Sequence, residues 1–366
     1  MARRRRALVL TAAGLVLVTL VLAWRWGPAL TLAVGLAVPS AETWLPGRRE
    51  SPRQEVRLAA GDHEVLADLY PAARPRAALL LVHGLSREGR RHPELARLAR
   101  LLARHGQTVL VPQFAGLAAF RLSGREVVEI RAGLEHLTAR HARVGIAGFS
   151  FGAGPALLAA AEAPGLALVA SFGGYADLAR VIAYLGTGVH AHGNRRYADT
   201  PEPYNRWKLL ALLAGFVDDG HDRARLEGLA RRKLEDPGAA MGGLEMSLGP
   251  EGQAVLALVL NGRPEQVDGL LARLSPRARE ALEGLSPERV AGRLPGRVLI
   301  AHGAGDVSIP FTESLRLAEA AGPRARVVIL RTFHHTGPRP FWSSLAGRVA
   351  DGLRLLSLAD ALLAGE

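Results

Sequence analysis

The chain of 366 residues contains no cysteine. Disulfide bonds, thiolate metal sites and a cysteine nucleophile are therefore excluded. Aromatic residues make up only 5% of the chain, which leaves too few rings for a surface that stacks nucleic-acid bases. Lysine is almost absent too, because every basic residue except Lys208 and Lys233 is arginine. The remaining composition, 49% hydrophobic and 22% charged, is that of a globular protein with enough apolar material for a large core.

The formal net charge of +12 suggests a nucleic-acid partner, but the distribution of the basic residues argues against one. Arg3, Arg4, Arg5, Arg6 and Arg25 supply part of the charge, and the other arginines are dispersed along the chain. Together with abundant alanine, leucine and glycine, the preference for arginine indicates a bias across the whole chain. We therefore predict no nucleic-acid partner.

The first 26 residues have the pattern of a membrane anchor. The basic segment Met1–Arg6 precedes Ala7–Trp24, a stretch of 18 residues without charge. As a helix that stretch reaches about 27 Å, near the lower limit for crossing a bilayer. Trp24 and Trp26 suit the interface, and the arginines favour an N-terminus on the cytoplasmic side. The sequence thus predicts a catalytic part outside the cytoplasm, periplasmic or extracellular, held at the membrane.

A cleaved secretory signal is the alternative reading of this region. Gly35–Ala37 offers a site of the small-x-small type, although the apolar stretch is longer than the usual signal core. Either reading places the rest of the chain outside the cytoplasm. Residues 27–53, with several prolines, glycines and charges, are predicted to form a linker.

An α/β pattern begins after this linker. Two short strands around the turn at Gly61 are followed by short apolar runs that alternate with amphipathic helical stretches, which predicts a mostly parallel sheet with helices on both faces. The predicted core occupies residues 54–174 and 296–366. Residues 175–295 show helical periodicity without a convincing strand, and we predict that they form an all-helical lid over a site. Nothing in the pattern selects an oligomeric state.

The segment Gly148–Gly152 (GFSFG) has the form G-x-S-x-G. The motif is short enough to arise by chance, so its surroundings matter. A predicted strand, 143–149, runs directly into it and a predicted helix, 151–163, leaves it. Such a corner strains Ser150 and exposes its hydroxyl, while the flanking glycines let strand and helix approach closely. The amino end of the helix also favours developing negative charge.

Further polar residues follow other predicted strands, in the order serine, aspartate, histidine. His83 and Gly84 come after the first buried strand, Asp306 after the strand 297–301, and the pair His334 and His335 after the strand 326–330. Because the carboxyl ends of parallel strands meet at one edge of a sheet, we expect these residues to lie near Ser150.

This arrangement resembles the α/β-hydrolase superfamily, nearest its esterase and dienelactone-hydrolase-like branches. The resemblance covers 55–174 and 295 to the end, and it implies a serine hydrolase that acts on a small acyl ester without a cofactor. By position, Ser150 matches the nucleophile, Asp306 the acid, and His335 or His334 the base, with His335 preferred.

The oxyanion hole is expected from Gly84, Leu85 and Phe151, through the backbone N–H groups of the latter two. The segment His83–Gly84 lacks the longer HGGG sequence, which disfavours the subtype of lipases that uses HGGG for its oxyanion hole.

Several alternatives remain open at this stage. Asp177, which follows another strand, is the reserve acid, and His83 is expected to be buried and bonded to the backbone. The spacing of His190 and His192 suits a metal, but no acidic pair completes the site, so we predict none. The same triad would serve a peptidase or amidase, and the fold could also be kept as a binding scaffold without activity. A complete set of serine, aspartate and histidine argues against the scaffold.

Overall fold

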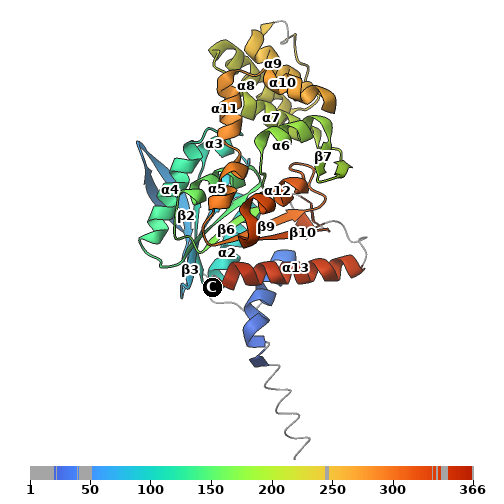
Figure 1. Ribbon diagram of the computed structural model, residues 1–366. Coiled ribbons are helices and arrows are strands. Elements are labelled where there is room, and N and C mark those ends of the chain that lie inside the picture. The colour runs from blue at the N-terminus through green and yellow to red at the C-terminus, as the bar shows by residue number, and fades with distance from the viewer. Residues whose placement is uncertain are drawn as a thin grey trace, which may run out of the picture.

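The structure is a computed structural model that describes residues 20–21, 23–38, 40, 52–243, 247–331, 333–334, 337–338 and 345–364. Its centre is an eight-stranded sheet in the order β1-β2-β4-β3-β5-β6-β9-β10 (Figure 1). β2 is antiparallel to its neighbours β1 and β4, and all the other pairs are parallel. The strands are β1 (Gln54–Ala60), β2 (His63–Tyr70), β3 (Ala77–Val82), β4 (Gln107–Pro112), β5 (Val144–Phe149), β6 (Leu168–Phe172), β9 (Arg297–Gly303) and β10 (Ala325–Leu330).

Helices cover both faces of the sheet, which is why its central strands are continuously apolar. In β3, Ala78, Leu80 and Val82 belong to one hydrophobic core, while Leu79 and Leu81 belong to the other. On the first face lie α4 (Arg125–Thr138), α5 (Ala153–Ala161) and α12 (Phe311–Ala321). On the second face lie α2 (Pro93–Arg104) and α13 (Leu345–Ala364). The predicted α/β sandwich is therefore confirmed.

The segment before β1 differs from the predicted linker. Residues 23–37 are helical, and Ala29, Leu32 and Ala33 are buried in the core of the second face. Arg25 forms a bidentate ion pair with Asp360 on α13, at 2.5 and 3.1 Å, so the two helices lie together below the sheet in Figure 1. The prolines and glycines of this region suggested a linker. The helix was not predicted because the residues against which it packs lie far along the chain.

Most of the predicted membrane anchor, residues 1–19 and 22, lies outside the described residues. Of the helices that the structure does describe, none combines the length and apolar character needed to span a bilayer. Membrane attachment and an extracytoplasmic location therefore stay predictions of the sequence.

A large insertion separates β6 from β9, as expected, and forms the upper lobe in Figure 1. It is not all-helical, because β7 and β8 form a hairpin around a turn in which Gly193 has a φ of +54°. Each of these strands has only four residues, too few for alternation to show in the sequence. The elements are α6 (Leu178–Thr187), β7 (Val189–His192), β8 (Arg195–Ala198), α7 (Pro203–Ala214), α8 (Gly220–Glu235), α9 (Pro250–Leu260), α10 (Val267–Ala272) and α11 (Pro276–Gly284).

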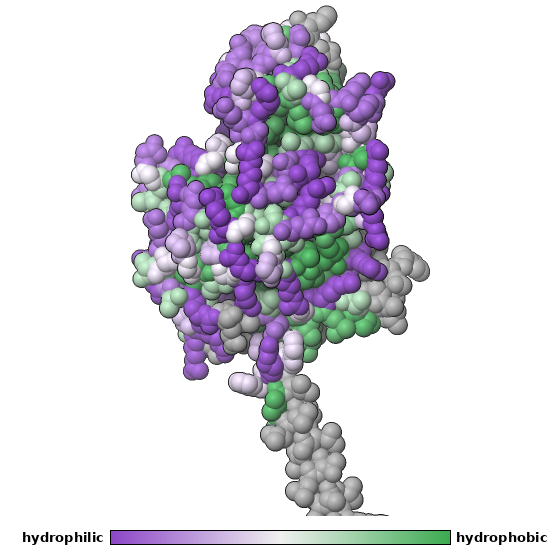
Figure 2. Space-filling model, viewed as in Figure 1, coloured by the Kyte–Doolittle hydropathy of each residue, from purple (hydrophilic) through white to green (hydrophobic). Residues whose placement is uncertain are grey.

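The insertion and the first face of the core share one hydrophobic cluster. Leu209, Leu212 and Leu213 of α7 are each at most 2% exposed and belong to the same cluster as the helices of that face. On the face shown in Figure 2, hydrophilic residues cover most of the insertion. α7 packs mainly against α8 and α9 within the insertion, and its leucines belong to the hydrophobic cluster that continues into the core.

Candidate active site

Ser150 stands at a sharp corner between a strand and a helix, as the motif predicts. β5 ends at Phe149, the short 3₁₀ helix η3 (Ser150–Gly152) follows at once, and α5 continues from Ala153. Ser150 has a φ of +52°, a left-handed conformation that costs a residue with a side chain roughly 1–2 kcal/mol. A conformation of this cost persists only where the surrounding structure imposes it.

Three glycines allow the chain to close around this corner. A Cβ on Gly152 would lie 2.1 Å from the carbonyl oxygen of His83, and one on Gly148 would lie 2.5 Å from the Cα of Ala153. A Cβ on Gly84 would lie 2.9 Å from the Cβ of Ser150. The loop after β3 and the corner after β5 are thus in direct contact, and only glycine fits at these positions.

Ser150 lies in the wall of a cavity of about 500 Å³. The loop after β3 provides one side of it through His83, Gly84 and Leu85, and the insertion provides another through Tyr204 and Lys208 of α7. The cavity is also lined by Leu36, Ser86, Arg87, Glu88, His92, Glu94, Leu95, Arg97, Leu98, Phe120 and Phe149.

Backbone strain is concentrated at this cavity. In the part of the chain that the structure describes, Ser150 and Phe120 are the non-glycine residues with positive φ, at +52° and +57°. Both line the same cavity. Strained residues of this kind cluster at functional sites, so their coincidence here supports the cavity as the active site.

The Leu85 N–H is oriented by a buried histidine. Phe114 N–H donates to His83 Nε2 at 3.1 Å, so the ring proton is on Nδ1, which donates to the Gly84 carbonyl oxygen at 2.8 Å. Burial lowers the pKa of His83 to about 4, which keeps the ring neutral. In a trans peptide the Leu85 N–H points opposite to the Gly84 carbonyl, away from the His83 ring. His83 thus fixes the peptide unit that is expected to form half of the oxyanion hole.

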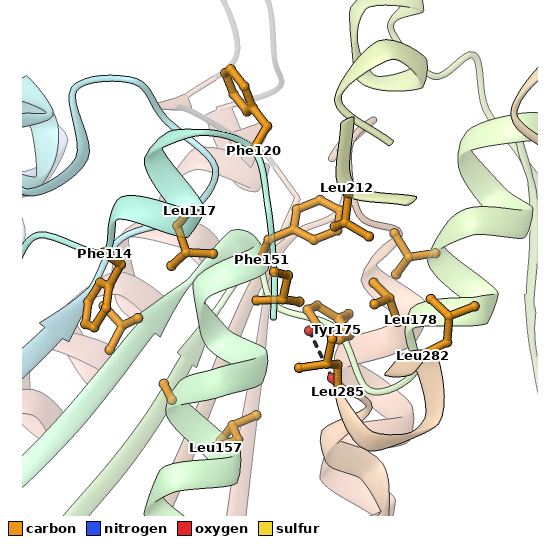
Figure 3. Packing of buried hydrophobic residues seen from close by; sticks show 14 of the residues in the cluster. Phe114, Leu117, Phe120, Phe151, Leu157, Tyr175, Leu178, Leu212, Leu282 and Leu285 are labelled. Atoms are coloured by element: carbon orange, nitrogen blue, oxygen red, sulfur yellow. Dashed lines mark hydrogen bonds between the residues drawn. The ribbon is translucent and has the colours of Figure 1, made fainter. Parts of the chain in front are cut away.

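Phe151 is anchored between the core and the insertion. Its side chain is 6% exposed, and its ring centroid lies 5.8 Å from that of Tyr175. Figure 3 shows the Phe151 ring next to Leu212 of α7 and to Tyr175. The Tyr175 hydroxyl donates to the Leu285 carbonyl oxygen at 3.0 Å. The packing of this side chain therefore holds the residue directly after Ser150.

Asp306 is buried beyond the carboxyl end of β9, with 3% of its surface exposed. Its Oδ1 accepts hydrogen bonds from the backbone N–H groups of Ser308 and Ile309, at 2.8 and 3.0 Å. Its Oδ2 lies 3.3 Å from Nε2 of His302. These bonds hold the carboxylate in one orientation, as the acid of a catalytic triad requires.

The reserve acid, Asp177, has a structural role. It is the N-cap of α6, where its Oδ1 accepts from the Arg180 N–H at 2.8 Å. Its own N–H donates to the buried carboxylate of Glu313 at 2.8 Å. These contacts account for Asp177 and leave Asp306 as the better candidate acid.

The two candidate bases follow β10 in the chain, and the structure describes only His334. His334 belongs to β11 (Phe333–His334), which pairs with β12 (Gly337–Pro338) and packs next to β9. β9 is the strand that leads to Asp306. His335, the preferred base, lies outside the described residues.

The histidines of the β7–β8 hairpin each have their own partners. His190 is hydrogen-bonded to Thr312 and Asp199, both at 3.0 Å, and His192 to Glu319 at 2.9 Å. Among the described residues, no group of three or more histidine, aspartate or glutamate side chains is arranged to hold a metal ion.

Solved structures of several hydrolases resemble this chain in fold. The α/β hydrolase GrgF from Penicillium sp. sh18 matches with a TM-score of 0.51 and 18% identity, over 85% of this chain and 100% of its own. A puromycin-hydrolysing peptidase from Mycobacterium tuberculosis matches with a TM-score of 0.50 and 18% identity, over 88% of this chain and 40% of its own. The chain has the α/β-hydrolase fold.

Some of these hydrolases are much longer than this chain. The chain spans only 39% of the acylaminoacyl peptidase of Pyrococcus horikoshii, which matches over 81% of this chain with 14% identity and a TM-score of 0.48. No family model and no curated relative matches the sequence. At identities this low, the α/β-hydrolase fold is what the likeness establishes.

Within this fold, the sequence did not indicate several residues that line the cavity together with Ser150. Phe120, Tyr204 and Lys208 come from loops and from the insertion, whose place relative to the core no local pattern reveals. His302 was missed as a support for Asp306. It is 2% exposed, and its Nε2 donates to the Ile309 carbonyl oxygen at 2.9 Å. The one available signal was the rarity of lysine, which draws attention to Lys208 and Lys233 alike.

The low pKa of His83 predicts a loss of stability in acid. The ordinary pKa of 6.5 applies in the unfolded chain, and the folded value is about 4, so the unfolded state binds more protons between these values. The contribution of His83 is fully present above pH 6.5 and falls as the pH drops towards 4, by up to about 3 kcal/mol.

Denaturant unfolding of the wild type and of His83→Gln at pH 7, 5.5 and 4.5 measures this effect. Gln keeps a donor and an acceptor but does not titrate, so the variant is expected to lose stability less steeply in acid. Other histidines whose pKa is lowered by burial, among them His105 and His190, titrate equally in both proteins. An identical pH dependence in the variant would show that His83 does not carry the effect.

Proposed function

We propose that this protein is a serine hydrolase that cleaves a carboxylic ester of a small molecule through an acyl-Ser150 intermediate. The observation that carries the proposal is the position of Ser150, strained at a strand–helix corner and exposed to a cavity of about 500 Å³. The loop that contains Gly84 and Leu85 touches this corner from the other side. This contact supports Ser150 as the nucleophile and the backbone N–H groups of Leu85 and Phe151 as donors to an oxyanion.

The reaction follows from these positions. As Ser150 Oγ attacks the ester carbonyl carbon, the histidine removes its proton, and the N–H groups of Leu85 and Phe151 stabilise the negative charge on the carbonyl oxygen. The carbon–oxygen bond to the alcohol then breaks, and the histidine returns the proton to the departing alcohol. A water molecule repeats the sequence on the acyl-enzyme, which releases the acid and restores Ser150.

The base of this triad is proposed to be His335, with His334 as the alternative. Asp306 would hold its ring in the productive tautomer and stabilise the positive charge that forms on it. The proximity of β11 to β9 supports a histidine in this region.

The insertion is proposed to act as a lid that determines acyl preference. α7 supports this role, since Tyr204 and Lys208 line the cavity that contains Ser150. Leu209, Leu212 and Leu213 of the same helix are buried, so the proposed contact with the substrate falls to Tyr204 and Lys208.

A fluorophosphonate probe tests the proposal directly, because it labels only a serine whose hydroxyl is activated as a nucleophile. We expect the probe to attach to Ser150, with the modified peptide identified by mass spectrometry, and labelling to disappear in Ser150→Ala. Ser86 is the matched control, since it lines the same cavity and its hydroxyl is bonded to Glu88. Labelling that persists in Ser150→Ala, or that is lost only in Ser86→Ala, would refute the assignment.

Ester and amide cleavage are separated by a second assay. The wild type is given p-nitrophenyl butanoate and the matching p-nitroanilide, which differ only in the leaving group. We expect hydrolysis of the ester without measurable release of nitroaniline, and release of nitroaniline that is lost in Ser150→Ala would instead identify an amidase.

A further inference from the structure

Lys208 places a positive charge in the wall of the Ser150 cavity. It lies on α7 of the insertion, and its Nζ is 4.7 Å from the centroid of the Tyr204 ring and 6.0 Å from that of Phe120. Cation–π contacts at these distances hold an ammonium group in position without neutralising its charge. The choice of lysine is unusual for this chain, which uses arginine at all but two of its 46 basic positions.

No described carboxylate forms an ion pair with this ammonium. The two acidic residues that line the same cavity have other partners. Glu88 accepts a hydrogen bond from the Ser86 hydroxyl, and Glu94 forms an ion pair with Arg97 at 2.8 Å. Burial lowers the pKa of Lys208, and the charge of Glu202 offsets this effect only in part.

A second cation flanks the same aromatic ring. The guanidinium carbon of Arg87 lies 5.9 Å from the Phe120 centroid, and Arg87 lines the cavity two residues after Leu85. Arg87 likewise makes no ion pair with a described carboxylate. Phe120, held at a φ of +57°, is thus the common support of two cations that come from different parts of the chain.

The charges of Glu202 and Glu88 act on Lys208 and Arg87 respectively, but no described carboxylate forms an ion pair with either cation. Two such cations in a partly desolvated cavity favour an anionic ligand, because a carboxylate there gains charge-assisted hydrogen bonds in a low dielectric. We infer that the substrate is an ester that carries a carboxylate, and that Lys208, aided by Arg87, binds this carboxylate while Ser150 attacks the ester carbonyl. This inference rests on the proposed serine hydrolysis. It goes beyond it by naming the charge of the substrate and the residue that selects it.

Two matched pairs of esters test the inference and locate the carboxylate. The first pair is the mono-p-nitrophenyl ester of adipate against p-nitrophenyl hexanoate, which differ in a carboxylate on the acyl side. The second is 4-carboxyphenyl butanoate against phenyl butanoate, which differ on the alcohol side. For the wild type, we expect kcat/KM to favour the anionic member of one pair by about tenfold or more, mainly through KM, which is the effect of one hydrogen bond to a charged group.

Lys208→Met is expected to reduce this preference about tenfold, and Lys208→Arg to restore part of it. Lys233→Met is the matched control, because Lys233 lies on the neighbouring helix α8, stacks on Trp207 and does not line the cavity. Its ratio of anionic to neutral kcat/KM should equal that of the wild type. Thermal unfolding of each variant identifies any that does not fold, and Lys208→Gln then replaces Lys208→Met.

Salt provides a readout that a purely structural role would not change. Raising the ionic strength from about 0.05 to about 0.5 M should weaken the preference of the wild type and leave that of Lys208→Met unchanged. Equal kcat/KM for both members of each pair, or a preference that survives in Lys208→Met, would overturn the inference while leaving the serine hydrolase intact.

A binding measurement separates this inference from the proposed function. Calorimetric titration of the full chain compares two matched pairs of amides: the monoamide of adipate against hexanamide, and 4-(butanoylamino)benzoate against N-phenylbutanamide. The anionic member of one pair should bind more tightly, and Lys208→Met should abolish the difference. If no ester is cleaved but an anionic member is still preferred through Lys208, the proposed hydrolysis fails and the anion site stands. If neither anionic member is preferred, the anion site fails.

Discussion

Replacing Ser150 with alanine is expected to lower kcat for a small p-nitrophenyl ester by at least about 10⁴-fold, because the variant has no oxygen with which to form the acyl intermediate. The unfolding transition should stay close to that of the wild type. Alanine fits the space of serine and meets the same strain at a φ of +52°. Initial rates and thermal unfolding of the two proteins, purified side by side, provide the measurement.

The control for this variant is Ser86→Ala, in the same cavity and on the loop that carries Leu85. Loss of its hydroxyl removes one hydrogen bond to Glu88 and no bond-forming atom, so its rate should remain far above that of Ser150→Ala. Comparable turnover by Ser150→Ala and the wild type would exclude the acyl-serine route altogether.

Replacing Asp306 with asparagine is expected to lower kcat by about 10⁴-fold, since the neutral amide stabilises neither the required histidine tautomer nor the imidazolium. The fold should survive. The Oδ1 of asparagine can still accept from the N–H groups of Ser308 and Ile309, which hold the aspartate now. Single-turnover rates would show whether the loss lies in the acylation step.

Asp177→Asn is the matched variant at the reserve acid. Asparagine caps helices as well as aspartate does, so α6 should keep its first turn and activity should change little. The opposite outcome, a large loss in Asp177→Asn and a small one in Asp306→Asn, would transfer the role of acid to Asp177.

Much of the core could be predicted from the sequence because it depends on local patterns. β3 is apolar throughout because helices cover both faces of the sheet, and this signal is visible in six consecutive residues. The corner at Ser150 could be predicted for the same reason. Gly148 is required by its contact with Ala153, a few residues further along the chain, so its spacing from Ser150 carries the information. Gly152 is required by the carbonyl oxygen of His83, which belongs to a distant segment.

The loop proposed to form the oxyanion hole and the proposed acid could be predicted only in part. Their order along the chain and their place after strands indicated Gly84, Leu85 and Asp306. The sequence did not indicate how they are held. The bond from His83 to the Gly84 carbonyl and the bonds around Asp306 depend on which atoms the folded chain brings within hydrogen-bonding distance, and several local arrangements are compatible with the same residues.

The sequence by itself determined the mostly parallel sheet and indicated Ser150 and Asp306 as the candidate nucleophile and acid, because strand patterns, the motif at Ser150 and chain order can be read without the fold. Tertiary structure decided that residues 23–37 pack on the core, that a hairpin lies within the insertion, and that Phe120 and Lys208 face the cavity of Ser150. Each of these depends on contacts between segments far apart in the chain. Such contacts are selected by the burial of apolar surface and the compensation of charge in the whole molecule, which no local pattern records.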